Sequence, residues 1–172
     1  LKKATIDLTQ EATEEEKEVA KQKVDEEATK AKDNIDQAST NDAVDQAKTT
    51  GNTEINNIQP EVVKKSDARD TIDEVARIKK AAIDQTPDAT TEEKEAAKAK
   101  VDQAVTEAKG HINEAINNSG VDEAKTNGTT TINAIQPEVI KKSEARQAID
   151  DLAKLKKATI DLTQEATEEE KE

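Results

Sequence analysis

The sequence contains no Cys, Met, Phe, Trp or Tyr, and its 172 residues include only one His and four Gly. Without Cys and with a single His, the chain cannot assemble a transition-metal cluster, because such sites need several thiolate or imidazole ligands. The absence of aromatic side chains removes the platforms on which single-stranded nucleic acids stack. Four Gly residues do not form a phosphate-binding loop such as G-x-x-x-x-G-K-[ST]. These absences exclude several common classes of binding site.

Negative charge is in excess, since 39 Asp and Glu residues face 26 Lys and Arg residues and the formal net charge is −13. The two signs are interleaved along the chain. Binding to a phosphate backbone requires patches of positive charge, and the same holds for an anionic membrane surface. No apolar run approaches the roughly 20 residues of a membrane span. We therefore expect neither nucleic acid nor a membrane as a partner.

The chain repeats itself, because residues 1–18 and residues 155–172 both read LKKATIDLTQEATEEEKE. The two segments start 154 residues apart, and half of this separation, 77 residues, also separates Pro60 from Pro137. An ungapped alignment of the first 77 residues with the next 77 gives 45 identical positions. The chain is therefore predicted to be part of a tandem array, in which each period is long enough to bury a small core of its own.

The first helix of each period is predicted by a stripe of apolar residues at helical spacing and by a start signal. A composition with 38% charged residues is by itself typical of a disordered chain. A disordered chain, however, has no reason to keep apolar residues at helical spacing. The stripe consists of Ala20, Val24, Ala28, Ala31, Ile35 and Ala38, and it recurs as Ala97, Val101, Val105, Ala108, Ile112 and Ala115. The capping-box spacing of Thr and Glu occurs at Thr13 and Glu16, at Thr90 and Glu93, and at Thr167 and Glu170.

Two more helices are predicted in each period. The second carries Val44, Ala47, Gly51, Ile55 and Ile58 on one face, and the same pattern recurs around Gly128. Gly in a helix interior costs about 1 kcal/mol relative to Ala, so Gly51 indicates either a close contact between helices or a break in this helix. The third helix is predicted to begin at Ser66 and to end near Asp84, after a connector that contains Pro60.

The predicted fold class is all-α, with tandem three-helix-bundle repeats that form an elongated array. Three apolar stripes per period can close on one another as an antiparallel bundle, and no stretch alternates as a strand does. We expect a partial repeat truncated at its N-terminus at residues 1–65, a complete repeat at residues 66–142, and the start of the next repeat at residues 143–172.

No residue is predicted to be catalytic, cofactor-binding or metal-binding, and we expect no enzyme activity and no cofactor. The sole His, His111, corresponds to Asn34 one period earlier, so it is interpreted as a surface residue outside any function of the repeat. The acidic run Glu14, Glu15 and Glu16 is interpreted as a helix start, where carboxylates suit the helix dipole. No segment has the spacing of an EF-hand loop, and none has a G-x-S-x-G turn that could hold a nucleophile.

Two longer segments resemble a known repeat. PDATTEEKEAAKAKVDQAV (87–105) and INAIQPEVIKKSEARQAID (132–150) are similar to the helical repeat of unknown function that forms long arrays in staphylococcal cell-wall-anchored surface proteins. The resemblance covers the whole chain. It implies a cell-wall-anchored location at the bacterial cell surface, a place in the stalk of a large protein, and an association with biofilm formation or cell aggregation. It supplies no binding or catalytic residues that could be assigned to positions of this chain.

Two functions of different classes remain open at this stage. In the first, the repeats are a stalk whose only partners are neighbouring repeats and which projects an adhesive domain from the cell wall. In the second, each repeat binds a host protein or makes homophilic contacts between cells. Binding faces are usually enriched in aromatic and Arg side chains, whereas this sequence has no aromatic residue and only Arg69, Arg77 and Arg146. The sequence therefore favours the stalk.

Overall fold

The computed structural model describes residues 1–163 and 165–171, and every regular element in these residues is an α-helix. The predicted all-α fold class is thus confirmed. The helices, in chain order, are α1 (Lys2–Asp7), α2 (Glu14–Gln37), α3 (Asn41–Asn57), α4 (Lys64–Asp84), α5 (Thr91–Glu114), α6 (Asn118–Ala134), α7 (Lys141–Asp161) and α8 (Glu168–Lys171).

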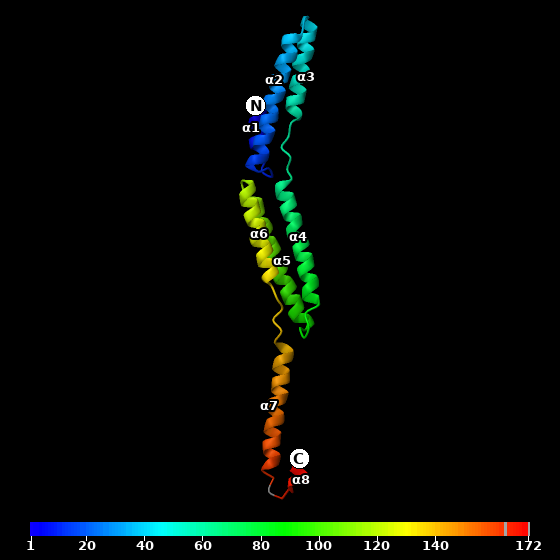
Figure 1. Ribbon diagram of the computed structural model, residues 1–172, viewed down its shortest axis with the longest axis vertical. Coiled ribbons are helices and arrows are strands. Elements are labelled where there is room, and N and C mark those ends of the chain that lie inside the picture. Colours follow the sequence, from blue (N-terminus) through cyan, green and yellow to red (C-terminus); the bar gives the residue numbers. More distant parts are fainter. Residues whose placement is uncertain (164, 172) are drawn as a thin grey trace.

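Helices α4, α5 and α6 form a complete antiparallel three-helix bundle, in which each helix packs against the other two (Figure 1). Helices α2 and α3 pack against each other in the same way one period earlier, and the short helix α1 lies beside α2. Because α1 corresponds to the last third of a helix such as α4, this earlier bundle is only partly present in the chain.

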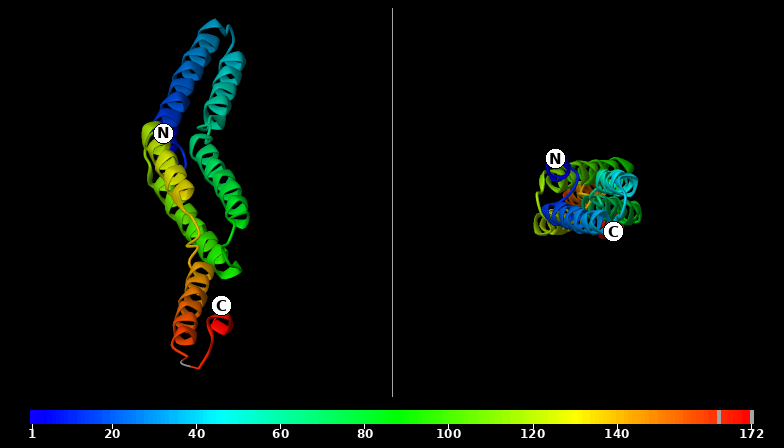
Figure 2. Two further views of the ribbon diagram at one scale, coloured as in Figure 1. Left: turned by 60° about the horizontal axis from the view of Figure 1, so that its bottom comes forward. Right: turned by 90° about the horizontal axis from the view of Figure 1, so that it is seen from above.

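The helices are stacked along one long axis (Figure 1). The chain leaves α3 and continues in the same direction into α4, and it leaves α6 and continues into α7. The two views in Figure 2 show the same arrangement obliquely and along the long axis. The two connectors, residues 58–63 and 135–140, contain no helix. Pro60 and Pro137 lie in these connectors, as predicted.

The predicted start signals of the first helices are confirmed. In the capping boxes of α2 and α5, the hydroxyls of Thr13 and Thr90 accept hydrogen bonds from the backbone amides of Glu16 and Glu93, and the two Glu side chains accept from the Thr amides in return. Thr167 and Glu170 make the same pair of hydrogen bonds at the start of α8.

The third helix begins two residues earlier than predicted, because α4 starts at Lys64 rather than at Ser66. The Ser66 hydroxyl donates to the carbonyl oxygen of Val63 and does not cap the helix. The amides of Val63 and Lys64 instead donate to a carboxylate from α2, a partner that local sequence does not reveal. Helices α4 and α7 therefore begin at residues 64 and 141, two residues before the starts predicted for the repeats at residues 66 and 143.

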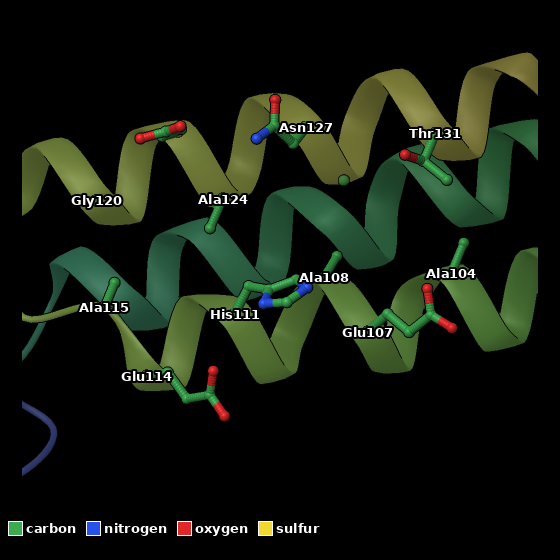
Figure 3. A pocket seen from close by; sticks show the side chains of 12 residues that line it. Ala104, Glu107, Ala108, His111, Glu114, Ala115, Gly120, Ala124, Asn127 and Thr131 are labelled. Atoms are coloured by element: carbon green, nitrogen blue, oxygen red, sulfur yellow. The ribbon is translucent and has the colours of Figure 1, made fainter.

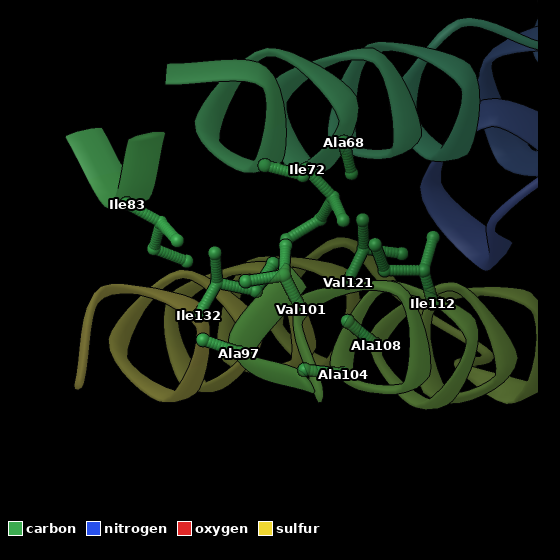
Figure 4. Packing of buried hydrophobic residues seen from close by; sticks show 11 residues of the cluster. Ala68, Ile72, Ile83, Ala97, Val101, Ala104, Ala108, Ile112, Val121 and Ile132 are labelled. Atoms are coloured by element: carbon green, nitrogen blue, oxygen red, sulfur yellow. The ribbon is translucent and has the colours of Figure 1, made fainter. Parts of the chain in front are cut away.

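The core of the complete bundle is built from Ala, Val and Ile, as the composition requires. Side chains of α4 point down onto those of α5 and α6 in Figure 4. The buried residues are Ala68, Ile72, Ala76, Ile83, Ala97, Val101, Ala104, Ala108, Ile112, Val121 and Ile132. Since Ala side chains are short, the helices must approach one another closely to fill the space between them.

Gly51 and Gly128 lie at these close approaches, and α3 and α6 run through them without a break. A Cβ atom added to Gly128 would lie 2.5 Å from Cβ of Ala108, and one added to Gly51 would lie 2.5 Å from Cβ of Ala31. The close contact is therefore the correct one of the two alternatives, and neither helix breaks at its glycine. Gly110 differs, because a Cβ there would meet no atom within 4 Å.

Candidate functional site

His111 lies exposed on α5, as interpreted from the sequence. No group of three or more His, Cys, Asp or Glu residues in the described part of the chain is placed to hold a metal ion. Among the described helices, none combines the length and apolar character needed to cross a membrane. What the structure offers instead is a surface groove and a set of contacts between neighbouring repeats.

The groove runs between α5 and α6 and has a volume of about 480 Å³. Figure 3 shows its floor of small side chains, which includes Ala104, Ala108 and Ala124, and its polar rim, which includes Glu107 and His111. Helices α5 and α6 touch at the bottom of the groove, where Gly128 lies against Ala108.

The rim of this groove is not repeated between periods. One period earlier, Glu107 and His111 correspond to Lys30 and Asn34, so the charge pattern of the rim differs. The contact of Ala108 with Gly128 does recur, as the contact of Ala31 with Gly51. The groove is thus a consequence of close helix packing, and the repeats do not share a ligand site there.

We call the region in which two neighbouring bundles meet the joint. It consists of residues 10–16, at the start of α2, and of residues 63–69 and 113–118, at the start of α4 and at the turn between α5 and α6. The Glu14 amide donates to the carbonyl oxygen of Ile116 at 2.9 Å, which ties the start of α2 to the turn between α5 and α6. The fully buried Thr13 donates its hydroxyl to the side-chain oxygen of Asn118 at 2.8 Å. The Asn118 amide in turn donates to Glu15 at 2.9 Å.

Lys65 lies at the centre of the joint and is only 2% exposed. Its ammonium group donates to the backbone oxygen of Asn113 at 2.7 Å and to that of Gln10 at 3.3 Å. Arg69, one turn later on α4, donates to the Asn113 side chain at 2.6 Å and to Glu11 at 3.0 Å. Both cations therefore bind the end of α5 and the loop before α2 at the same time.

Glu16 couples two helices through one carboxylate. One oxygen accepts from the Thr13 amide at 2.8 Å and completes the capping box of α2. The other accepts from the amides of Val63 and Lys64, both at 2.9 Å, and caps the start of α4. Because α2 and α4 belong to successive bundles, this side chain fixes the direction in which the chain enters the next bundle.

The same coupling recurs at the next junction. Glu93 accepts from the Thr90 amide at 2.7 Å and from the amides of Ile140 and Lys141 at 2.9 Å. Arg146 binds Asp88 at 3.0 Å, one period after Arg69 binds Glu11. The contacts of Glu16 and of Arg69 with the neighbouring bundle therefore recur at the second junction, at the same positions of the repeat.

Hydrogen bonds to the joint carboxylates lower their pKa. For Glu93, bonds from the amides of Lys141, Thr90 and Ile140 lower the pKa to about 2. For Glu16, partial burial alone would raise the pKa, but the amide hydrogen bonds outweigh it and the net shift is downward. Glu93 is therefore ionised, and able to accept these bonds, at any pH well above 2.

Sequence reasoning identified Thr13, Glu16, Thr90 and Glu93 as helix caps but missed their part in the joint. It assigned no role to Lys65. The sequence feature that could have indicated the joint is the recurrence of these residues after 77 positions. A helix cap without any role in the joint would recur in the same way, so the recurrence does not identify the joint. The partners of the joint lie about 50 to 100 residues apart, which no local pattern reports.

A family model described as Domain of Unknown Function (DUF1542) matches the chain twice, at residues 1–63 and 64–140. The second match starts at the first residue of α4 and ends just before α7, so it spans the complete bundle.

The chain is also similar to very large staphylococcal proteins. Extracellular matrix-binding protein EbhA of Staphylococcus aureus strain Mu3 is 29% identical over 163 residues, which are 94% of this chain and 2% of that protein. EbhA of strain Newman is 29% identical over 166 residues, which are 96% of this chain and 5% of that protein. The chain thus spans a small fraction of the length of these relatives. No solved structure matches it.

Proposed function

The chain belongs to the DUF1542 family, and from this premise we propose that its repeats form the non-catalytic stalk of a staphylococcal surface protein. In this function the array projects an adhesive domain away from the cell wall, and it serves biofilm formation or cell aggregation through that domain. The partners of each repeat within the stalk are the repeats on either side of it. The observation that carries the proposal is the joint, which holds successive bundles along one axis.

The joint supports a stiff stalk for a physical reason. A string of bundles on flexible linkers would shorten by coiling, and its length would grow only with about the square root of the number of units. Here Lys65 is buried between two bundles, and Glu16 ties the start of α2 to the start of α4. These contacts restrict bending at the place where a linker would otherwise be free. Their recurrence at Glu93 supports the same geometry at each further repeat.

A second candidate function is that the repeats themselves bind extracellular matrix. The observation that favours it is the name of the similar proteins from Staphylococcus aureus, which states matrix binding. The chain covers 2–5% of those proteins, so the binding named there can reside in another part of them. The rim of the α5–α6 groove differs between periods, which argues against one matrix site per repeat.

Display on cells separates the two functions. A reporter domain is anchored to the bacterial wall through arrays of two, four and eight periods, and its access to a bulky antibody is measured. We expect access to fall as the array is shortened and to return when an unrelated rigid helical spacer of equal length replaces the repeats. If the spacer fails while the 172-residue chain alone binds matrix proteins, the stalk proposal is wrong and the repeats are the binding element.

A further inference from the structure

A small pocket lies beside each of the two connectors between bundles, and we infer that it binds an Arg side chain of a partner protein. The pocket is formed by the start of the first helix of a repeat and by the connector that leads to the next bundle. It is distinct from the groove between α5 and α6. The inference goes beyond the stalk function, because it gives each repeat a partner outside the array.

The pocket forms twice from equivalent residues. Its volume is about 180 Å³ at the first connector and about 240 Å³ at the second. Every residue that lines the second pocket has its counterpart, 77 positions earlier, in the lining of the first. The first pocket has one further wall, Asn118, which comes from the neighbouring bundle. A recurrence at all of these positions marks the pocket as a feature of the repeat.

Neighbouring elements do not fill the pocket. At the first connector the following bundle is in place, and it contributes Asn118 to the wall of an open pocket. At the second connector α4 packs along α5 and α6, and none of the residues of α4, all of which the structure describes, lines the pocket. The pocket is therefore open both beside a following bundle and beside a preceding helix.

One side of the pocket is apolar and half open to solvent. Val63 in the first connector is 52% exposed, and its counterpart Ile140 in the second connector is also 52% exposed. Val19 of α2, which lines the first pocket, is exposed to the same extent. An aliphatic chain laid against these side chains would remove apolar surface from water, which is favourable.

The rest of the lining carries an excess of negative charge. Three carboxylates and one ammonium group line the first pocket, from Glu15, Glu16, Glu61 and Lys23, and their counterparts in the second pocket are of the same residue types. The Lys23 ammonium lies 3.8 Å from Glu61, and the two side chains are 50% and 80% exposed, so this ion pair is weak. A cation of a partner can therefore compete for Glu61.

An Arg side chain matches both sides of the pocket. Its aliphatic stem can cover Val63 while its guanidinium donates hydrogen bonds to Glu15 and Glu61. The pocket is smaller than the roughly 300–1,000 Å³ of sites that enclose a drug-sized molecule, so its size suits a single side chain. Arg is one of the residue types that most often anchor protein interfaces in such pockets. The repeat has few Arg residues of its own, and here the partner supplies the anchor.

An NMR titration of the ¹⁵N-labelled 172-residue chain with N-acetyl-arginine N-methylamide tests the inference. We expect the amide signals of Gln59, Val63, Gln136 and Ile140 to shift in a saturable way. The dissociation constant should be about 1–10 mM, because a single side chain buries little area. The citrulline analogue has nearly the same shape but no charge, and it should bind about fivefold more weakly. Free arginine should also bind more weakly than the capped probe, because its own carboxylate meets the acidic lining.

The two pockets of one chain are controls for each other. Glu61→Gln removes a carboxylate from the first pocket alone. It should raise the dissociation constant read from Val63 about three- to fivefold, and leave the one read from Ile140 within about 1.5-fold of the unchanged chain. Glu138→Gln should have the reverse effect. Glu26→Gln removes the same charge from an exposed position of α2 outside the pocket, and it should change neither constant.

Other outcomes overturn the inference. If Glu61→Gln weakens both pockets equally, the probe responds to the net charge of the chain and not to a site. If the citrulline analogue or a leucine analogue binds as well as the arginine probe, the occupant is not cationic. If free arginine binds more tightly than the capped probe, the pocket is a site for a free amino acid. If none of the four amide signals shifts at ten times the expected dissociation constant, the pocket does not bind arginine.

Discussion

Alanine in place of Gly128 should destabilise the complete bundle by about 2 kcal/mol, the range in which overpacked cores fall. The added Cβ would lie 2.5 Å from Cβ of Ala108 and 3.0 Å from Cδ1 of Ile72. The atom of Ala108 is fixed to its backbone, so the two helices themselves must move apart. This cost should exceed the gain of about 1 kcal/mol that Ala brings to a helix interior. Urea unfolding followed by circular dichroism measures the difference.

Gly110 provides the matched control, since it lies in α5 and a Cβ atom added to it would meet no atom within 4 Å. Gly110→Ala should stabilise the chain by about 0.5–1 kcal/mol, because only the helix propensity changes. The same substitution is therefore expected to act with opposite sign at two glycines of one bundle. Equal effects of both substitutions would contradict the assignment of Gly128 to a close helix contact.

Methionine in place of Lys65 should cost about 1–3 kcal/mol and should loosen the joint. The substitution keeps the aliphatic part of the side chain but removes the donor to the carbonyl oxygens of Asn113 and Gln10. Loss of a buried hydrogen-bonding partner carries a cost of this size. Thermal unfolding reports the loss of stability, and small-angle X-ray scattering of the same samples reports whether the chain bends more.

Lys142 tests whether the effect belongs to the joint, because it is the equivalent of Lys65 one period later and is exposed in this chain. Lys142→Met should change stability by less than about 0.5 kcal/mol, as surface substitutions usually do. A similar loss at both positions would show that Lys65 acts through its own helix and not through the contact between bundles.

The elements of the fold followed from the sequence because they depend on local information. A stripe such as Ala97, Val101 and Ala108 fixes one face of a helix, and Thr90 with Glu93 fixes its start. The recurrence of Gly51 at Gly128 on an apolar stripe indicated either a close contact or a break in the helix, and the structure shows the close contact. These features need no knowledge of which helix lies opposite.

The joint did not follow from the sequence because it depends on the relative placement of two bundles. Ser66 is a good helix cap by residue type, yet α4 begins at Lys64 because Glu16, 48 residues earlier, accepts from the Lys64 amide. In the same way, two adjacent Lys residues in a sequence are normally predicted to be exposed to solvent. Only the arrangement of the two bundles shows that Lys65 is buried and Lys64 binds Asp122 on α6.

The length of the particle as repeats are added tests the stiff stalk most directly. Arrays of two, four and eight periods are compared by the maximum dimension from small-angle X-ray scattering. Since successive bundles are held along one axis, each period should add a constant increment close to the length of α5, about 36 Å for its 24 residues. A straight line through the three lengths is the predicted result. Growth with about the square root of the number of periods would mean that the joints are flexible, and it would contradict the account.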